Sequence, residues 1–267
     1  MTHLDKKNLL LLNLILGFFA WSDISKLQVP EGFEIQEFVT EIDDARQMVE
    51  GNNYIFVGTK SAGNVYAIDK NNSNKVSIIL TELDMPTGVA LKNGDLYIAE
   101  TDTIHVVKNI ESKLVTNEQI TTEIFFSDLP RKTMWNPVKK AWHGWKWIDF
   151  GPDGALYISE GVPCNVCDEN DPRYGTILKL DNNILSIYAD GVRNSVGFDW
   201  HPETKEMYFT DNGRDWMGDD IPPCELNRVV NAGDHFGFPF FHGKNIPDTG
   251  FDCLLYTSPS PRDGTSS

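Results

Sequence analysis

One pattern, repeated four times along the chain, restricts the possible folds more than any other feature. In each copy, a strand rich in Tyr, Ile, Val and Phe ends in small or polar residues, and a second alternating strand follows after a turn or loop. Three copies also have an upstream strand and turn, as in "WIDFGPDGALYISEG". The copies are "YIFVGTKSAGNVYAID" (54–69), "LYIAETDTIHVVK" (96–108), "LYISEG" to "YGTILKL" (156–180) and "MYFTDNG" to "ELNRVV" (207–230).

The spacing of these copies predicts an all-β protein, a β-propeller. Leu96 and Leu156 are 60 residues apart, and Leu156 and Met207 are 51 apart. Units of about 40–60 residues with several strands each are typical of propeller blades. Helical periodicity is almost absent after the N-terminus. We expect a partial propeller of about four blades within residues 23–252; a β-sandwich is the structural alternative, but it does not account for the recurring unit.

The N-terminus, residues 1–22, has the pattern of a secretory signal peptide. Lys6 and Lys7 precede the apolar run "NLLLLNLILGFFAW", and Ala20 and Ser22 are small residues at suitable cleavage positions. The apolar run of about 13 residues is shorter than the roughly 20 that cross a bilayer. We therefore expect a secreted or extracytoplasmic protein without a membrane span. A buried first helix is the alternative.

The last residues, 253–267, break the pattern. The stretch "LLYTSPSPRDGTSS" is rich in Ser, Thr and Pro and has no strand alternation. It predicts a non-native or disordered tail that follows a truncated chain, and Cys253 falls within it. A propeller that lacks its last blades leaves an unpaired edge, so we expect the remaining blades to belong to a longer protein.

Charge and cysteines limit the class of protein further. The chain has 39 acidic and 23 basic residues, a net charge of −16, which argues against a nucleic-acid partner and an anionic membrane surface. Cys164 and Cys167 form "CNVC", but no second C-x-x-C or H-x-x-x-H pair completes a zinc site. In an oxidising compartment we expect a local disulfide between these two cysteines.

A single histidine, His143, stands in "AWHGWKWIDF", a stretch that the other repeats do not share. Imidazole has a pKa near working pH and serves as a general base. The residues alone leave two interpretations open: an imidazole packed among Trp142, Trp145 and Trp147, or a base at the mouth of a site.

The sequence resembles the glucose/sorbosone dehydrogenase family over residues 28–250. The similarity lies in "LQVPEGFEIQEFV" with "DDARQM", in "HGWKWIDFGPDGALYISEG", in "YADGVRNSVGFDWHPETKEMYFTDNGRDWMGDDIPPCELNRV" and in "AGDHFGFPFFHG". "NGRDW" and the "GDD" to "ELN" stretch are most similar to the sorbosone-dehydrogenase-like branch. This resemblance implies a six-bladed propeller and an enzyme that oxidises a sugar with pyrroloquinoline quinone and Ca²⁺, acting on a small-molecule sugar and an external electron acceptor.

The resemblance also implies roles for five residues. His143 matches the catalytic base, which takes the hydroxyl proton. Arg193 and Asn194 in "GVRNS" match the pair at the cofactor, where a guanidinium stabilises charge on the quinone oxygens. Gly213 and Arg214 match the positions whose backbone carbonyls bind Ca²⁺, a hard cation that prefers oxygen ligands.

Other polar residues have structural interpretations. His105 lies mid-strand without an evident partner, His201 in a hairpin turn, and His235 and His242 beside the aromatic run "FGFPFF". A structural turn explains three acidic residues equally well, and they are left out of the metal site: Asp215, Asp219 and Asp220.

Two departures from the family pattern keep other functions open. Cys224 stands where the family more often has an acidic residue, and the family's later basic cofactor contacts have no counterpart before the chain ends. A calcium-dependent propeller lactonase, using carboxylates such as Glu100, Glu160 and Asp211, is one alternative. A non-enzymatic extracellular binding propeller is the other.

Overall fold

The computed structural model describes residues 24–130 and 142–251, in two units, Met1–Thr40 and Glu41–Ser267. The signal peptide expected at 1–22 and the tail expected at 253–267, including Cys253, lie outside the described residues. In the first unit the described part begins with a short 3₁₀ helix, Ile24–Lys26, and continues as irregular backbone with a turn between Pro30 and Phe33. The propeller boundary at residue 23 stays a prediction.

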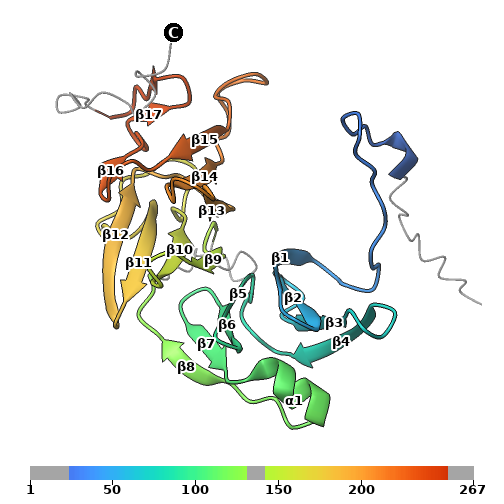
Figure 1. Cartoon of the computed structure of the whole chain (residues 1–267). Coiled ribbons are helices and arrows are strands. Elements are labelled where there is room, and N and C mark those ends of the chain that lie inside the picture. The colour runs from blue at the N-terminus through green and yellow to red at the C-terminus, as the bar shows by residue number, and fades with distance from the viewer. Residues whose placement is uncertain (1–23, 131–141, 252–267) are drawn as a thin grey trace, which may run out of the picture. The chain divides into compact units, whose positions relative to one another are not determined.

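The second unit consists almost entirely of antiparallel sheets whose strands follow one another in sequence (Figure 1). The sheets of the blades have the strand orders β1-β2-β3-β4, β5-β6-β7-β8, β9-β10-β11-β12 with β16 (Asp234–His235) added beside β12, and β13-β14-β15. The all-β, four-blade propeller arrangement predicted from the repeats is therefore confirmed, each repeat forming the second and third strands of a blade. The bounds are β1 Ala45–Glu50, β2 Tyr54–Thr59, β3 Val65–Asp69, β4 Lys75–Leu80, β5 Gly88–Lys92, β6 Asp95–Ala99, β7 Ile104–Val107, β8 Glu123–Phe126, β9 Ile148–Phe150, β10 Leu156–Glu160, β11 Thr176–Asp181, β12 Ile184–Asp190, β13 Phe198–Trp200, β14 Met207–Asp211 and β15 Glu225–Arg228.

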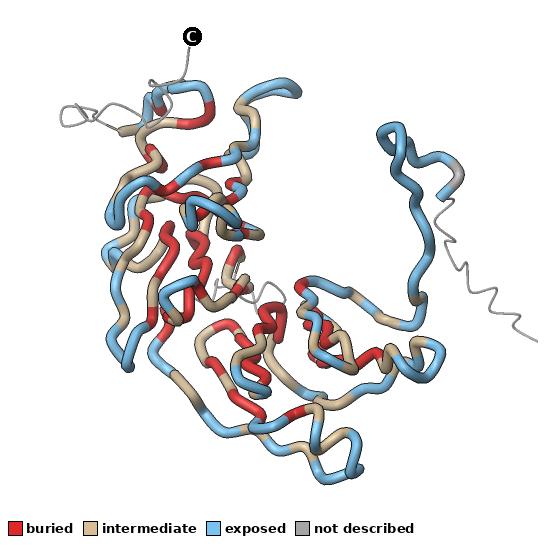
Figure 2. The backbone as a smooth tube through the Cα atoms, viewed as in Figure 1, coloured by how far each residue is buried: buried red, intermediate tan, exposed pale blue. Residues whose placement is uncertain are grey.

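The burial of each strand explains its composition. All five residues of β10 are buried, because apolar side chains of neighbouring sheets cover both of its faces, and the strand reads "LYISE" without polar alternation until its end. The outer strand β12 alternates exposed and partly buried residues along most of its length. Figure 2 shows the same division, with buried residues along the strands and exposed residues in the turns.

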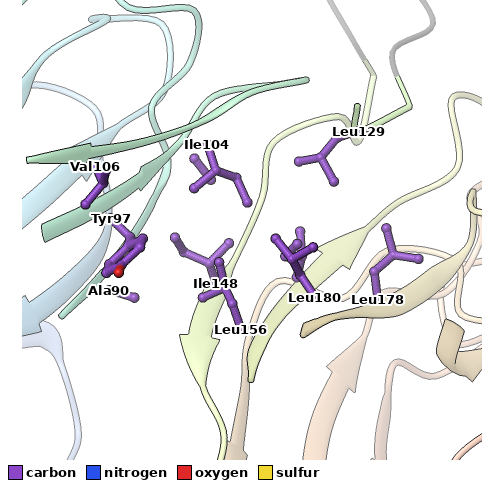
Figure 3. Packing of buried hydrophobic residues seen from close by; sticks show 11 residues of the cluster. Ala90, Tyr97, Ile104, Val106, Leu129, Ile148, Leu156, Leu178 and Leu180 are labelled. Atoms are coloured by element: carbon purple, nitrogen blue, oxygen red, sulfur yellow. The ribbon is translucent and has the colours of Figure 1, made fainter. Parts of the chain in front are cut away.

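Three apolar clusters fill the spaces between neighbouring sheets. One cluster joins β2 and β3 of the first blade to β5, β6 and β7 of the second blade. Another joins β10, β11 and β12 of the third blade to β13 and β14 of the fourth blade. The cluster between these two joins β5, β6 and β7 to β9, β10 and β11. Figure 3 shows Ile104 and Tyr97 on one side of this cluster and Leu156 and Leu180 on the other. Each blade thus buries its apolar faces against the next blade, which is the main stabilising term of the unit.

One glutamine connects the inner strands of three blades. Gln47 of β1 is buried and donates from Nε2 to the carbonyl of Ile148 in β9, at 2.7 Å. Its Oε1 accepts hydrogen bonds from the backbone N–H groups of Val89 in β5, at 3.2 Å, and of Ile148, at 3.1 Å. These three strands lie next to one another in the middle of the second unit (Figure 1). One side chain therefore satisfies backbone groups that the inner strands leave unpaired.

The structure adds short elements that the repeats did not predict. The helix α1, Ile110–Thr116, connects β7 to β8, and residues in the left-handed conformation, Asn109 and Asn117, bound it. Only Ile110 of this helix is buried, so the sequence carries no clear helical period. After the fourth sheet come β16 (Asp234–His235), which pairs in parallel with β12, and the hairpin of β17 (Phe241–His242) and β18 (Ile246–Pro247). Across the described ranges, none of the helices combines the length and hydropathy of a bilayer-crossing segment.

Candidate functional site

His143 lies shortly before the inner strand β9 and is 5% exposed. The rings of Trp142 and Trp145 flank it, with centroid distances of 5.4 and 5.9 Å, the latter edge-on. Its backbone has φ +56°, in the left-handed region. A residue other than glycine held there costs about 1–3 kcal/mol, and such residues cluster at functional sites.

The two ring nitrogens of His143 have different surroundings. The Nδ1 atom lies 2.9 Å from the carbonyl oxygen of Val162, a contact that requires Nδ1–H to donate and leaves the lone pair on Nε2. Nε2 forms no hydrogen bond with any residue of the described ranges. Burial, followed by the positive charge of Arg193, lowers the pKa of His143 to about 4. The imidazole is therefore neutral near pH 7, and Nε2 can accept a proton.

Gly161 makes room for His143 and Asn194 to approach each other. A Cβ at Gly161 would lie 2.7 Å from both the Cβ and the carbonyl oxygen of His143, and 3.1 Å from Oδ1 of Asn194. Asn194 is 4% exposed, and its side-chain amide forms no hydrogen bond with another described residue. The structure thus brings together two of the predicted residues, and each has an uncommitted polar atom.

The backbone at Arg193 and Asn194 is held by a buried carboxylate, Asp211, at the end of β14. Asp211 accepts from the N–H of Arg193 at 2.9 Å and from the N–H of Asn194 at 2.7 Å. Burial raises the pKa of Asp211 to about 7, although both hydrogen bonds lower it, and Glu225 on the paired strand raises it further. Asp211 therefore positions the Arg-Asn pair rather than facing solvent.

The guanidinium of Arg193 is buried and held by two loops. Nε and Nη2 donate to the carbonyl oxygen and to Oδ1 of Asn165, at 2.9 and 2.8 Å, and Nη1 donates to the carbonyl of Asn212 at 3.1 Å. Asp215 Oδ2 lies 3.7 Å from Nη2. Three of the five N–H groups have these partners, and the side chain itself is only 5% exposed.

Gly213 and Arg214 line a small cavity together with Asp211, Glu225 and His242. The side chain of Arg214 turns to Asp248, which also lies 2.8 Å from Nε2 of His242. Neither backbone carbonyl, at Gly213 or Arg214, accepts a hydrogen bond from a residue in the described part. Two carbonyls beside a cavity suit a hard cation such as Ca²⁺. Within residues 24–130 and 142–251, no three His, Cys, Asp or Glu side chains are grouped so that they could hold a metal ion.

Three residues after His143, Lys146 forms a buried ion pair with Glu160. Lys146 Nζ donates to Glu160 Oε1 at 2.8 Å and to the carbonyl of Gly144 at 2.9 Å, and neither side chain is exposed. Burial raises the pKa of Glu160 to about 7, and the charge of Lys146 acts against this rise. The pair ties the segment that carries His143 to the end of β10.

The loop 161–175 contains the expected disulfide between Cys164 and Cys167. Asn165, between the two cysteines, contacts Arg193 as described and also accepts from the N–H of Asp215 at 2.8 Å. The disulfide therefore constrains a loop that holds the Arg193 guanidinium. Cys224 is an exposed free thiol.

Several residues that the sequence singled out lie apart from this site. His105 has a partner after all, because its Nε2 lies 2.8 Å from Oε2 of Glu100, which directly follows β6, the strand that pairs with β7. His201 occupies the predicted hairpin turn, where Nδ1 accepts from two backbone N–H groups. The carboxylates considered for a lactonase are each engaged separately: Glu100 with His105, Glu160 with Lys146, and Asp211 with backbone amides.

The sequence pattern indicated Asp211 only as a possible lactonase carboxylate, and it did not indicate Asn165 or Lys146 at all. All three support the site through contacts with other segments, Asp211 with the backbone of Arg193 and Asn194, Asn165 with the Arg193 guanidinium and Lys146 with Glu160. Lys146 offered a local signal, since a charged residue stands between tryptophans in "HGWKW" just before a buried strand. The local signal for the supporting role of Asp211 is its place as a carboxylate at the end of β14, where it is buried.

Comparisons with known proteins agree with the fold. No protein-family model matches the chain. An uncharacterised protein from Borreliella burgdorferi is 33% identical over 240 residues, covering 85% of this chain, and the chain spans 60% of the length of that relative.

Solved structures of β-propeller dehydrogenases resemble the chain. The pyrroloquinoline-quinone-bound aldose sugar dehydrogenase from Streptomyces coelicolor matches with a TM-score of 0.59 and 16% identity, over 80% of this chain and 69% of that one. The quinone domain of pyranose dehydrogenase from Coprinopsis cinerea matches with a TM-score of 0.64 and 11% identity, over 80% of this chain and 58% of that one. The soluble aldose sugar dehydrogenase from Escherichia coli matches with a TM-score of 0.53 and 13% identity, over 75% of this chain and 64% of that one. At these identities the likeness establishes a propeller of this fold.

Proposed function

We propose that the protein is a secreted, quinone-dependent oxidoreductase that oxidises a CH–OH group of a sugar and passes the electrons to an external acceptor. The proposal places it in the glucose/sorbosone dehydrogenase family, in the sorbosone-dehydrogenase-like branch. The observation that carries it is that His143 is a buried, neutral imidazole. Its Nδ1–H donates to the Val162 carbonyl, and its Nε2 accepts no hydrogen bond from the residues that the structure describes. The names of the structural neighbours, dehydrogenases of sugars, support the same chemistry.

His143 acts as the general base. A sugar hydroxyl at Nε2 gives up its proton as the C–H hydrogen leaves with its electron pair, so that the carbon becomes a carbonyl. The Val162 carbonyl keeps the proton on Nδ1 and the ring in place, and it stabilises the imidazolium after proton transfer. Trp142 and Trp145 exclude water from two sides of the ring, which maintains the difference between the two nitrogens.

Pyrroloquinoline quinone, when bound, supplies the acceptor of the hydride. Arg193 and Asn194 would hold it through the two remaining guanidinium N–H groups and the free amide, since both donate to oxygens that gain negative charge. The carbonyls of Gly213 and Arg214 would hold Ca²⁺. Asp211 and the Asn165 loop keep these donors in position before any ligand binds.

The test is a reconstitution of the purified protein with pyrroloquinoline quinone and Ca²⁺, followed by dye reduction with a panel of aldoses. We expect sugar-dependent reduction that His143→Ala abolishes while quinone binding, followed by absorbance, is retained. Quinone binding without reduction by any sugar would contradict the dehydrogenase proposal, and full activity of His143→Ala would contradict the role of His143.

The two alternatives predict other results. A lactonase turns over lactones without quinone, and a binding propeller takes up no quinone in the titration. The separate engagement of Glu100, Glu160 and Asp211 gives the lactonase no support from the described residues.

A further inference from the structure

Lys60, which directly follows β2 in the first blade, reaches the segment that carries His143. Its Nζ lies 3.6 Å from the centroid of the Trp145 ring, within the range of a strong cation–π contact. The same ring meets His143 edge-on at 5.9 Å. Residues 60 and 145 belong to different blades, so the fold places an ammonium group from one blade beside the candidate base of another.

The charge of Lys60 has no direct partner among the described residues. Asp44, the acidic residue near it, pairs with Arg46 at 3.1 Å and accepts from the N–H of Ser61 at 2.5 Å. Partial burial and the charge of Arg46 lower the pKa of Lys60, and Asp44 acts in the opposite direction. A half-buried ammonium that is covered by an indole on one side, with no acceptor among the residues that the structure describes, is suited to bind an anion.

His143 therefore lies near two cations, Lys60 and Arg193, each of which disfavours a positive imidazole. Asp215 is the acidic group that acts on it in the opposite direction, and it is 55% exposed and pairs with Arg193. Of the charged side chains in the described ranges that act on His143, two are positive and one is negative, in a protein whose net charge is −16. A ligand beside His143 would be favoured by a negative group directed at Lys60.

We propose that Lys60, held on Trp145, is a carboxylate-binding residue of the His143 site. The carboxylate has two possible sources, the quinone cofactor, which is a tricarboxylate, or an acidic sugar such as a uronic acid. The choice between these sources rests on the proposed function, but the binding role of Lys60 does not. A neutral residue at position 60 removes a charge-assisted hydrogen bond, which corresponds to about tenfold or more in affinity.

The experiment measures binding rather than turnover. Pyrroloquinoline quinone and D-glucuronate are titrated separately into the protein, with binding followed by calorimetry and by quenching of tryptophan fluorescence. Lys60→Met removes the charge and Lys60→Arg retains it. Lys92→Met is the matched control, because Lys92 is also half-buried and lies over an aromatic ring, Phe150, at 4.6 Å, in the second blade. Thermal unfolding checks that all variants are folded.

Each outcome decides the question. A loss of about tenfold for the quinone in Lys60→Met, with Lys60→Arg and Lys92→Met near wild type, supports the cofactor as the source. The same loss for D-glucuronate alone supports an acidic substrate, and it upholds Lys60 even if the quinone does not bind and the proposed function fails. Unchanged affinity of folded Lys60→Met for both probes, or no binding of either probe to the wild type, overturns the proposal.

Discussion

The ammonium of Lys146 lies 2.7 Å from Oε2 of Glu160, and neither side chain is exposed to solvent. The same ammonium donates to the carbonyl of Gly144, and Glu160 directly precedes the glycine that packs on His143. The ion pair thus holds the segment between His143 and β9 against the end of β10. Burying two charges is costly, so the pair is better understood as fixing a conformation than as adding stability.

Removing one partner of this pair is expected to be more harmful than removing both. Lys146→Met leaves a buried carboxylate unpaired and should cost about 3–5 kcal/mol of unfolding free energy. Lys146→Met/Glu160→Met should recover most of this loss while activity stays low, because His143 loses its support. Urea unfolding of both single variants and the double variant gives the coupling energy; additive losses would contradict a buried, coupled pair.

The pH dependence of the site should reflect a neutral His143. Its pKa is lowered from 6.5 to about 4, so the acid limb of kcat/KM is expected near pH 4. Arg193→Met removes a positive neighbour and should move the limb upward. An NMR titration of the His143 ring checks the value without activity, and a midpoint near 6.5 in the folded wild type would be inconsistent with the buried geometry.

The same shift affects stability. Because the folded-state pKa of His143 is below its ordinary value, the unfolded chain binds the extra proton between about pH 6.5 and pH 4. The contribution of His143 to the free energy of unfolding therefore falls as the pH drops through this window. His143→Gln should lack this contribution. Denaturant midpoints of wild type and variant, measured from pH 7 to pH 4, should converge.

Gly161 provides a test of the close approach to His143. In Gly161→Ala the new Cβ would meet the Cβ and carbonyl oxygen of His143 at 2.7 Å, so the imidazole must shift. We expect a loss of at least tenfold in kcat/KM and a destabilisation of about 1–3 kcal/mol. Gly197→Ala is the control, because its nearest neighbour is a Trp147 ring atom at 4.0 Å. Equal effects of the two substitutions would argue against the packing described.

Gln47 is expected to be important for the contacts between blades. Gln47→Ala leaves the backbone N–H groups of Val89 and Ile148 and the Ile148 carbonyl without this partner. Unsatisfied buried groups of this kind cost about 1–3 kcal/mol each. Gln47→Glu keeps an acceptor for the N–H groups of Val89 and Ile148 and loses only the donor to the Ile148 carbonyl. It should therefore lower the free energy of unfolding less than Gln47→Ala does. Thermal unfolding with hydrogen exchange at these amides measures the difference.

Asp211 should make stability depend on pH in the opposite direction from His143. Its pKa is raised from 3.8 to about 7, so its contribution is full at low pH and falls as the pH rises through this interval. Asp211→Asn lacks this dependence and also loses one acceptor for the Arg193 and Asn194 amides. The variant should therefore be less stable than wild type near pH 4, with a smaller difference near pH 7. A difference that is constant across this range would contradict a carboxyl of raised pKa.

The sequence by itself determined the blades and their order. Alternating strands with turn residues between them recur along the chain, and strand pairing within a blade involves neighbouring segments, so local pattern was sufficient to predict it. The disulfide between Cys164 and Cys167 is equally local. The motifs also indicated which residues to consider, His143, Arg193 and Asn194.

Only the tertiary structure decided how those residues are held and charged. The Nδ1 contact of His143 comes from Val162, the backbone of Arg193 is held by Asp211, and Lys60 reaches Trp145 from another blade. Such contacts depend on how twisted sheets pack face to face, because the packing sets which loop ends meet. A sequence pattern with a period of two residues records the buried face of a strand, but it does not record which partner covers that face.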